Sequence, residues 1–269
     1  MRRPLVPAIA AALLCAGCST ADAGSGDKPT AASPPSASSS GHRSAVREAV
    51  AALREDSAGF RQEIELEGGG RVYDLTVSGG FDFAADKGHV AVDLPGGAID
   101  HSDQVFADGK IYIRGVEGFG EDTWGVVLRD EARAHYLLRS PLNDPEHVLL
   151  QIAAMREVSR EGEETVQGVR AVRYRGILDH RTLTLRMAPE TRTKMDEARD
   201  ALGSDLPVFA DAWVDSRGRL VQARTDADLA GVRVTLTMTL SDIGKPVRVT
   251  VPRPDETVPV TKVSGILNG

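Results

Sequence analysis

The feature that most limits the fold of this chain is an alternation of apolar and polar side chains, which recurs along most of its length. In residues 232–240 (VRVTLTMTL) every second side chain is apolar. Successive side chains of a β-strand point to opposite faces of a sheet, so this alternation predicts strands with one buried face. Runs of similar character cover residues 60–66, 73–77, 81–83, 89–94, 104–114, 157–161, 169–178, 208–214 and 220–229. The chain therefore predicts a large, mainly antiparallel sheet.

Short turns separate these predicted strands. Asp108-Gly109 lies between two β-prone runs, and this dipeptide is the strongest local signal for a two-residue hairpin. Residues 215–218 (DSRG) predict a second hairpin turn. The glycines at 68–70, 79–80 and 96–97 are also interpreted as turn glycines. No helical pattern follows any of them, so they do not indicate a phosphate-binding loop.

Helical patterns are confined to a few short segments of the chain. Residues 44–57 carry apolar side chains at three- and four-residue spacing, which predicts an amphipathic helix. Residues 130–138 are also expected to be helical. A further helix is predicted to begin at Asp144-Pro145, a capping residue followed by proline, and another to cover residues 189–202. Antiparallel strands with helices gathered in two places indicate an α+β fold.

The N-terminus carries the features of an export signal. Arg2 and Arg3 precede ten apolar residues (5–14), too few to span a bilayer as a helix. The following Cys15-Ala16-Gly17-Cys18 resembles a bacterial lipobox, and that resemblance implies that Cys18 is lipidated. Modification of Cys15 instead would put Leu14 at the cleavage position, where a small residue is expected. An ordinary secretory signal is the remaining alternative.

Four segments follow from this interpretation. Residues 1–17 are expected to be a lipoprotein signal peptide. Residues 18–43, rich in Ser, Ala, Pro and Gly, are expected to be a lipidated cysteine and a disordered tether, because they cannot bury enough apolar surface to fold. Residues 44–255 are predicted to be a single domain, and residues 256–269 a C-terminal tail.

Composition excludes several classes of function. The only two cysteines are Cys15 and Cys18, so the predicted domain has no disulfide, cysteine nucleophile or cysteine-ligated metal. The formal net charge of −7 does not favour nucleic acid as a partner. Common motifs for nucleotide cofactors, zinc hydrolysis and serine nucleophiles are missing. We therefore expect no cofactor, no metal site and no enzymatic activity.

A few polar clusters were weighed as sites. His101 and Asp103 would share one strand face, which permits an acid–base pair, but polar strand residues beside a turn are the more ordinary interpretation. The acidic run at residues 161–164 (EGEE) lacks the alternating oxygen ligands of a cation loop. Asp226 and Asp228 are interpreted as polar strand residues in the same way.

The chain as a whole is similar to the LppX/LprG-type lipoproteins of actinobacteria and, more remotely, to LolA-like lipoprotein carriers. The segments that carry the resemblance, besides the lipobox, are 172–176 (VRYRG), 212–215 (AWVD), 218–221 (GRLV) and 240–247 (LSDIGKPV). The resemblance implies a strongly curved antiparallel sheet, an incomplete half-barrel with helices on its concave face. It also implies an apolar cavity for acyl chains between the helices and the sheet.

From this resemblance we expect a membrane-anchored extracytoplasmic lipoprotein that binds a lipid or another amphiphile, with a possible protein partner in the cell envelope. A sensor or regulatory module of a membrane signalling protein is the alternative. A hydrolase with His101 or His135 in a cleft is a second alternative. The apolar side chains expected to line the cavity are Val46, Val50, Leu53, Phe81, Phe83, Val105, Tyr112, Leu149, Ile152, Met155 and Trp213. Each would equally suit an ordinary core.

Overall fold

The computed structural model describes residues 36–269, apart from residues 119, 121 and 230. The signal peptide, Cys15, Cys18 and most of the expected tether therefore lie outside the described residues. Twelve strands form one sheet. They are β1 (Ser57–Gly68), β2 (Arg71–Asp82), β3 (Lys87–Asp93), β4 (His101–Ala107), β5 (Lys110–Arg114), β6 (Trp124–Leu128), β7 (Arg156–Val166), β8 (Val169–Ile177), β9 (Val208–Asp215), β10 (Leu220–Leu229), β11 (Val232–Ser241) and β12 (Thr257–Pro259).

The two halves of the chain meet in the middle of this sheet. The strand order is β12-β6-β5-β4-β3-β2-β1-β11-β10-β9-β8-β7, so β1 joins the N-terminal meander to the last long strand, β11. Phe60 of β1 lies opposite Leu240 of β11, and Ile64 lies opposite Leu236. All neighbours are antiparallel except β12 and β6. The predicted α+β fold with an open, curved antiparallel sheet is confirmed.

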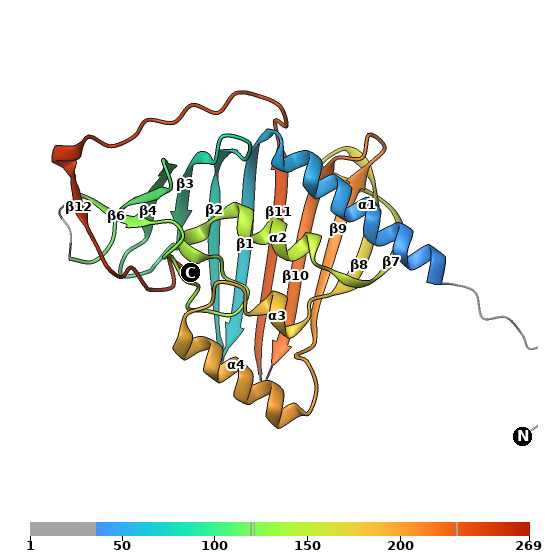
Figure 1. The fold of residues 1–269 in the computed structure, drawn as a ribbon. Helices are drawn as coiled ribbons and strands as arrows, with labels where there is room; N and C mark the ends of the chain where they lie inside the picture. The colour runs from blue at the N-terminus through green and yellow to red at the C-terminus, as the bar shows by residue number, and fades with distance from the viewer. Residues whose placement is uncertain (1–35, 119, 121, 230) are drawn as a thin grey trace, which may run out of the picture. The chain divides into compact units, whose positions relative to one another are not determined.

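The helices lie together on one face of the sheet (Figure 1). They are α1 (Ser36–Arg54), α2 (Pro145–Ala153), α3 (His180–Leu183) and α4 (Pro189–Leu202), with two short 3₁₀ turns, η1 (Pro141–Asn143) and η2 (Pro254–Glu256). The start of α2 is capped as predicted. Asp144 accepts a hydrogen bond from the Glu146 amide, and Pro145 occupies the first turn. Helix α4 has the predicted bounds.

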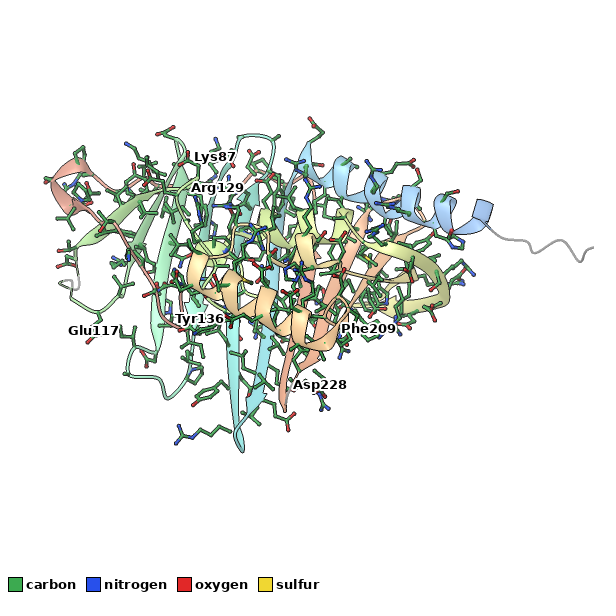
Figure 2. All side chains as sticks on the ribbon, turned by 60° about the horizontal axis from the view of Figure 1, so that its bottom comes forward. Lys87, Glu117, Arg129, Tyr136, Phe209 and Asp228 are labelled. Atoms are coloured by element: carbon green, nitrogen blue, oxygen red, sulfur yellow. The ribbon has the colours of Figure 1, made fainter. Side chains whose placement is uncertain are left out.

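One apolar cluster fills the space between the helices and the sheet face they cover. Its largest fully buried members come from strands on both sides of β1, from α2 and from positions just after α2 and β8. They are Phe81, Phe106, Leu75, Ile111, Ile113, Leu149, Ile152, Met155, Leu178, Leu220, Leu236 and Met238. Figure 2 shows side chains throughout the layer between α1, α2 and the sheet. The burial of this layer is the main source of stability.

The strand register confirms one predicted turn and corrects another. Asp108 and Gly109 both have positive φ (52° and 69°), as a two-residue hairpin between β4 and β5 requires. Gly79 and Gly80, by contrast, lie inside β2 and make no turn. A Cβ on Gly79 would lie 2.0 Å from the His89 carbonyl oxygen of β3, so glycine permits a close approach of two strands there.

The predicted helix at residues 130–138 is wrong. Instead, Ala134 forms a parallel bridge with Met187: the Ala134 amide donates to the Arg186 carbonyl (2.9 Å), and the Ala188 amide donates to the Ala134 carbonyl (2.8 Å). Leu138 has a φ of 55°, which ends any regular helical path. The backbone of this segment is therefore bonded to a distant loop rather than to itself.

Both ends of the expected domain extend further than the sequence indicated. Helix α1 begins at Ser36, so residues 36–43, assigned to the tether, are helical. Ser44 lies inside this helix, and its hydroxyl donates to Glu48 Oε1 (2.8 Å). Residues 256–269 are part of the fold, because β12 pairs with β6 and the side chain of Leu267 is buried.

Candidate functional site

The structure brings eight of the eleven expected cavity residues together. All eight are buried in the apolar cluster between the helices and the sheet. They are Val46, Val50 and Leu53 of α1, Phe81 of β2, Phe83 just after it, Leu149 and Ile152 of α2, and Met155 after α2. Their side chains contact one another or common neighbours, and the cavities described below are lined by none of them. In this conformation these residues form a packed core.

The other three expected residues lie on the opposite face of the sheet. Val105 and Tyr112 form a separate cluster with Trp124 and Val126, and Trp213 packs with Ala171 and Val221. Strand alternation explains this placement: the neighbours of Tyr112, Ile111 and Ile113, face the main core, so Tyr112 must face away. The hydrophobicity of Val105, Tyr112 and Trp213 was visible in the sequence, but the side of the sheet that the helices would cover was not.

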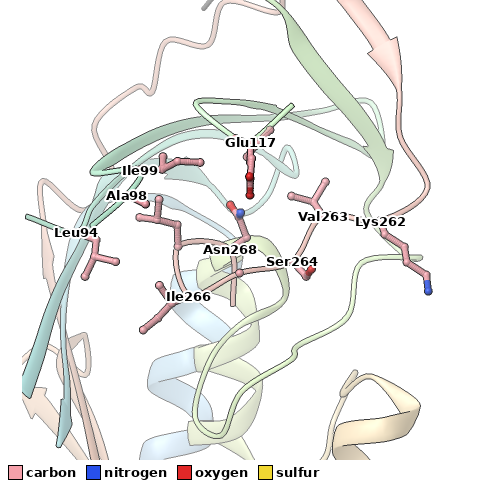
Figure 3. Close-up of a pocket in the computed structure, with 12 residues that line it drawn as sticks. Leu94, Ala98, Ile99, Glu117, Lys262, Val263, Ser264, Ile266 and Asn268 are labelled. Carbon is pink, nitrogen blue, oxygen red and sulfur yellow. The ribbon is translucent and has the colours of Figure 1, made fainter. Parts of the chain in front are cut away.

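A cavity of about 550 Å³ lies at one end of the sheet, beside the last residues of the chain (Figure 3). Its apolar wall comes from Leu94, Ala98 and Ile99, which follow β3, from Val116 after β5, and from Ile266. Residues 262–268 form its other side, and Figure 3 shows them crossing the cavity. This site could not be predicted from a sequence interpretation in which residues 256–269 are a tail outside the domain.

A second cavity of about 490 Å³ lies on the other side of the same C-terminal segment. It is lined by Val127, Leu142 and Ala188 among others, and it shares Lys262, Val263 and Ser264 with the first cavity. Residues 262–264 therefore separate two hollows. Among the described residues, the charged side chains that line the first cavity are Glu117 and Lys262.

A buried polar cluster lies against the C-terminal segment, next to the first cavity. Arg139 is 2% exposed, and its Nη2 atom donates to Asn143 Oδ1 (2.6 Å) and, more weakly, to the Leu267 carbonyl oxygen (3.4 Å). Asn143 Nδ2 donates to the same carbonyl (2.7 Å). Burial lowers the pKa of Arg139 to about 9. The guanidinium is thus cationic at neutral pH and enclosed.

A second buried arginine, Arg129, has a different environment. It donates to both carboxylate oxygens of Asp144 (2.9 and 2.7 Å) and to Glu146 (3.2 Å), and it also forms an ion pair with Asp86. Arg186 donates to Asp144 as well (3.1 Å). Burial alone would lower the pKa of Arg129, but the hydrogen bonds and charge of Asp144 outweigh it and raise the pKa. This network fixes the start of α2 against the sheet.

The polar clusters considered as catalytic or metal sites form surface networks. His101 contacts Asp93 (2.6 Å) and Asp103 (3.2 Å), and the hydrogen bond to Asp93 is the main cause of its raised pKa. Asp103 also accepts from Arg114 (2.6 Å). His101 is half exposed, so the pair lies at the surface rather than in a cleft. The structure therefore gives no support to the interpretation of His101 and Asp103 as a catalytic pair.

The remaining candidates are also engaged with other side chains. His135 lies 3.6 Å from Glu190, whose side chain is largely exposed. In the acidic run, Glu163 pairs with Arg170 and Arg160, and Glu164 pairs with Arg173 (3.2 Å) and accepts from Trp213 (2.8 Å). Within residues 36–269, gaps excepted, no group of three or more His, Cys, Asp or Glu side chains is placed to hold a metal ion. Among the helices described, none is long and apolar enough to cross a membrane.

No family model and no curated protein matches this chain. Among solved structures, the chain is similar to LprF from Mycobacterium bovis, with 13% identity over 80% of this chain and 98% of that one and a TM-score of 0.49. It is similar to the lipoprotein LppX from Mycobacterium tuberculosis, with 13% identity over 78% and 99% and a TM-score of 0.44. It is also similar to a LolA superfamily protein from Nitrosomonas europaea, with 8% identity over 81% and 96% and a TM-score of 0.30. The LppX/LprG-type and LolA-like proteins expected from the sequence are thus among the structures to which the chain is similar.

Proposed function

We propose that this protein is a lipid-anchored extracytoplasmic lipoprotein that binds a lipid or another amphiphile in an apolar cavity. The observation that carries the proposal is the cavity of about 550 Å³ with an apolar wall of Leu94, Ala98, Ile99, Val116 and Ile266. Its volume lies within the range of about 300–1,000 Å³ that small-molecule sites occupy. Transport of the ligand across the cell envelope is the wider role that such binding would serve.

The physical basis of binding is the removal of acyl chains from water. Each buried methylene contributes about 0.8 kcal/mol, so a short stretch of chain gives substantial affinity. The eight core residues from Val46 to Met155 would add a larger apolar surface if α1 and α2 moved away from the sheet. We propose that this interior accepts longer chains after such a movement.

The membrane anchor is the second part of the proposal. Cys18 would carry the lipid, and the net charge of −7 does not favour electrostatic attachment to anionic headgroups instead. Metabolic labelling with a radioactive fatty acid should modify the wild-type chain and Cys15→Ala, and should fail in Cys18→Ala. Labelling that survives in Cys18→Ala and is lost in Cys15→Ala would move the anchor to Cys15.

Native mass spectrometry of the protein, purified from membranes of its own host, tests the binding itself. We expect additional masses that organic extraction removes and that extracted lipids restore. A spectrum without adducts, together with no rebinding of the extracted lipids, would contradict the proposal.

A sensor or regulatory module of a membrane signalling protein is the second candidate. The observation that favours it is the filled layer beneath α1 and α2, in which Leu149 and Ile152 are completely buried. Such a module needs no space for an acyl chain. It would show an unfolding temperature that is unaffected by added lipid, whereas a carrier is stabilised by any ligand that binds only its folded state.

A further inference from the structure

Arg139 is a buried cation without a buried counterion. Its Nε and Nη1 atoms have no hydrogen-bond partner, and in the described part of the chain no carboxylate lies within ion-pair distance of it. The side chain is nevertheless 2% exposed. Burying a charge is costly unless it is paired, and the cost exceeds that of burying a neutral polar group. A fold rarely retains such a group for packing alone, because an apolar side chain of similar volume would serve better.

Other polar atoms around Arg139 also lack partners. Gln104 Oε1 and Ser140 Oγ are buried without a hydrogen bond. Gln104 reaches the C-terminal segment only through a long contact from Nε2 to Asn268 Oδ1 (3.5 Å). The hydroxyl of Ser140 can rotate to donate, and the guanidinium has unused N–H groups. The unused donors are therefore those of the guanidinium and of the Ser140 hydroxyl, on adjacent residues, whereas the unpaired Gln104 Oε1 is an acceptor.

The last residues of the chain occupy this point. Ile266 contributes to the wall of the cavity, and Leu267 inserts its side chain into the main core. The Leu267 carbonyl oxygen accepts the hydrogen bonds from Asn143 and Arg139. Gly269 lies so close to the Ser140 carbonyl that a Cβ there would be 2.0 Å from its oxygen. The segment thus presents apolar side chains to the apolar wall and one oxygen to the donors.

The C-terminal segment therefore resembles a bound amphiphile, with apolar groups at one end and an oxygen acceptor at the other, but it differs in charge. A backbone carbonyl is neutral, whereas the guanidinium is a cation with two unpaired nitrogen atoms, Nε and Nη1. A carboxylate or phosphate oxygen would pair with the guanidinium through N⁺–H···O⁻ hydrogen bonds, in which both partners are charged. An anion would also remove the cost of the unpaired charge.

We propose that Arg139, with Asn143 and Ser140, is the headgroup site for an anionic amphiphile, and that residues 265–269 occupy this site when no ligand is bound. The acyl chain would extend into the cavity beside Leu94, Ile99 and Val116. This inference deepens the proposed lipid binding and rests on it. It names the ligand class as an acyl chain with a carboxylate or phosphate head.

The two charged side chains that line the cavity among the described residues determine which control variant the experiment needs. Lys262 and Glu117 both line it and are exposed, so solvent screens their effect. Lys262 is the competing explanation for any preference for anions. Lys262→Met is therefore the matched control for Arg139→Met, since each variant replaces one cation beside the same cavity by the same apolar side chain.

The experiment uses the purified full chain, stripped of lipid, and displacement of a fluorescent fatty acid. The competitors are oleate, oleoyl lysophosphatidate, uncharged methyl oleate and inorganic phosphate. We expect the two anionic amphiphiles to bind at least about ten-fold more tightly than methyl oleate, as one charge-assisted hydrogen bond allows. Comparison of oleate with oleoyl lysophosphatidate distinguishes a carboxylate from a phosphate head. Inorganic phosphate should not displace the probe, which separates a lipid headgroup from a free anion.

Arg139→Met should abolish the preference for anions, so that oleate and methyl oleate bind with affinities within about two-fold of each other. Lys262→Met should alter the preference by less than about two-fold, as an exposed charge would. Leu267→Ser removes the buried apolar side chain of the C-terminal segment and should tighten the binding of oleate several-fold. Retained binding of methyl oleate shows that Arg139→Met is folded.

The outcomes separate the two proposals. If none of the acyl compounds binds, lipid binding itself fails, and the headgroup site fails with it. If anionic and uncharged chains bind equally, or if Arg139→Met weakens both to the same extent, the headgroup site is wrong while lipid binding stands. A preference that Lys262→Met abolishes would overturn the assignment to Arg139. Displacement by inorganic phosphate alone would overturn the lipid head as the ligand.

Discussion

Arg129 and Arg139 make an instructive pair, because both are buried in the connection between β6 and α2. Arg129 is surrounded by Asp144, Glu146 and Asp86, and their charge raises its pKa. Arg139 contacts only neutral groups through its hydrogen bonds, and burial lowers its pKa to about 9. Similar burial therefore accompanies opposite electrostatics. The comparison shows that partners, rather than depth, distinguish an arginine that holds the fold together from one that is left with capacity for a ligand.

The largest expected effect concerns Arg129, the arginine whose charge is paired. Asp144→Ala removes the helix cap of α2 and leaves Arg129 and Arg186 without a shared carboxylate. We expect it to lower the free energy of unfolding by about 3–5 kcal/mol, the usual cost of breaking a buried ion pair. Urea denaturation measures this loss. The nearby exposed Asp130→Ala should cost less than about 0.5 kcal/mol, and equal losses would contradict the structural role of the Arg129 network.

A smaller effect should follow pH through His147, a buried neighbour of the same network. Burial, assisted by the charge of Arg186 and opposed by that of Asp144, lowers the pKa of His147 to about 4. Between this value and the ordinary value of about 6.5, the unfolded chain binds a proton that the folded chain does not. Stability should therefore fall as the pH falls through this range, by about 2 kcal/mol from pH 6.5 to pH 5.

The contribution of His147 is isolated by comparison with His147→Gln. The raised pKa of His101 acts in the opposite direction, but it is common to both proteins and cancels in their difference. Denaturation series at several pH values should give a flatter profile for the variant between pH 5 and pH 6.5. Parallel profiles would show that His147 titrates in the folded protein as it does in the unfolded chain.

The smallest effect is expected for Arg139. Because Arg139→Met removes an unpaired buried charge and keeps much of its volume, the free energy of unfolding should change by less than about 1 kcal/mol or should increase. The same denaturation measurement tests this expectation. A loss comparable with that of Asp144→Ala would place Arg139 in the same structural class as Arg129 and remove the contrast between them.

The parts of the fold that could be predicted from the sequence depend on neighbouring residues. The Asp108-Gly109 hairpin, the capped start of α2 and the bounds of α4 are each specified by short-range preferences. Residues 130–138 could not be predicted in this way, because their backbone hydrogen bonds are made with the segment at Arg186–Ala188. Gly79 resembled a turn glycine because the proximity of β3 is not visible in the sequence.

The candidate site was predicted less completely than the fold. Period-two alternation identifies which side chains share a face, as for Ile111 and Ile113, but it does not say which face the helices cover. Tyr112 and Trp213 were therefore expected in a cavity from which the sheet separates them. Arg139 carried no sequence signal at all, because its unusual state results from the segment at Leu267, far away in the chain.

The sequence by itself determined the class of fold: alternating strands, a few amphipathic helices, local turns and an N-terminus with the pattern of a lipobox. These features depend on backbone geometry and on residues that lie a few positions apart. Tertiary structure alone decided that the layer beneath α1 and α2 is filled, that the last residues belong to the domain, and that Arg139 is buried without a counterion. Each of these depends on which distant segments exclude water from one another, and local sequence patterns carry no information about that.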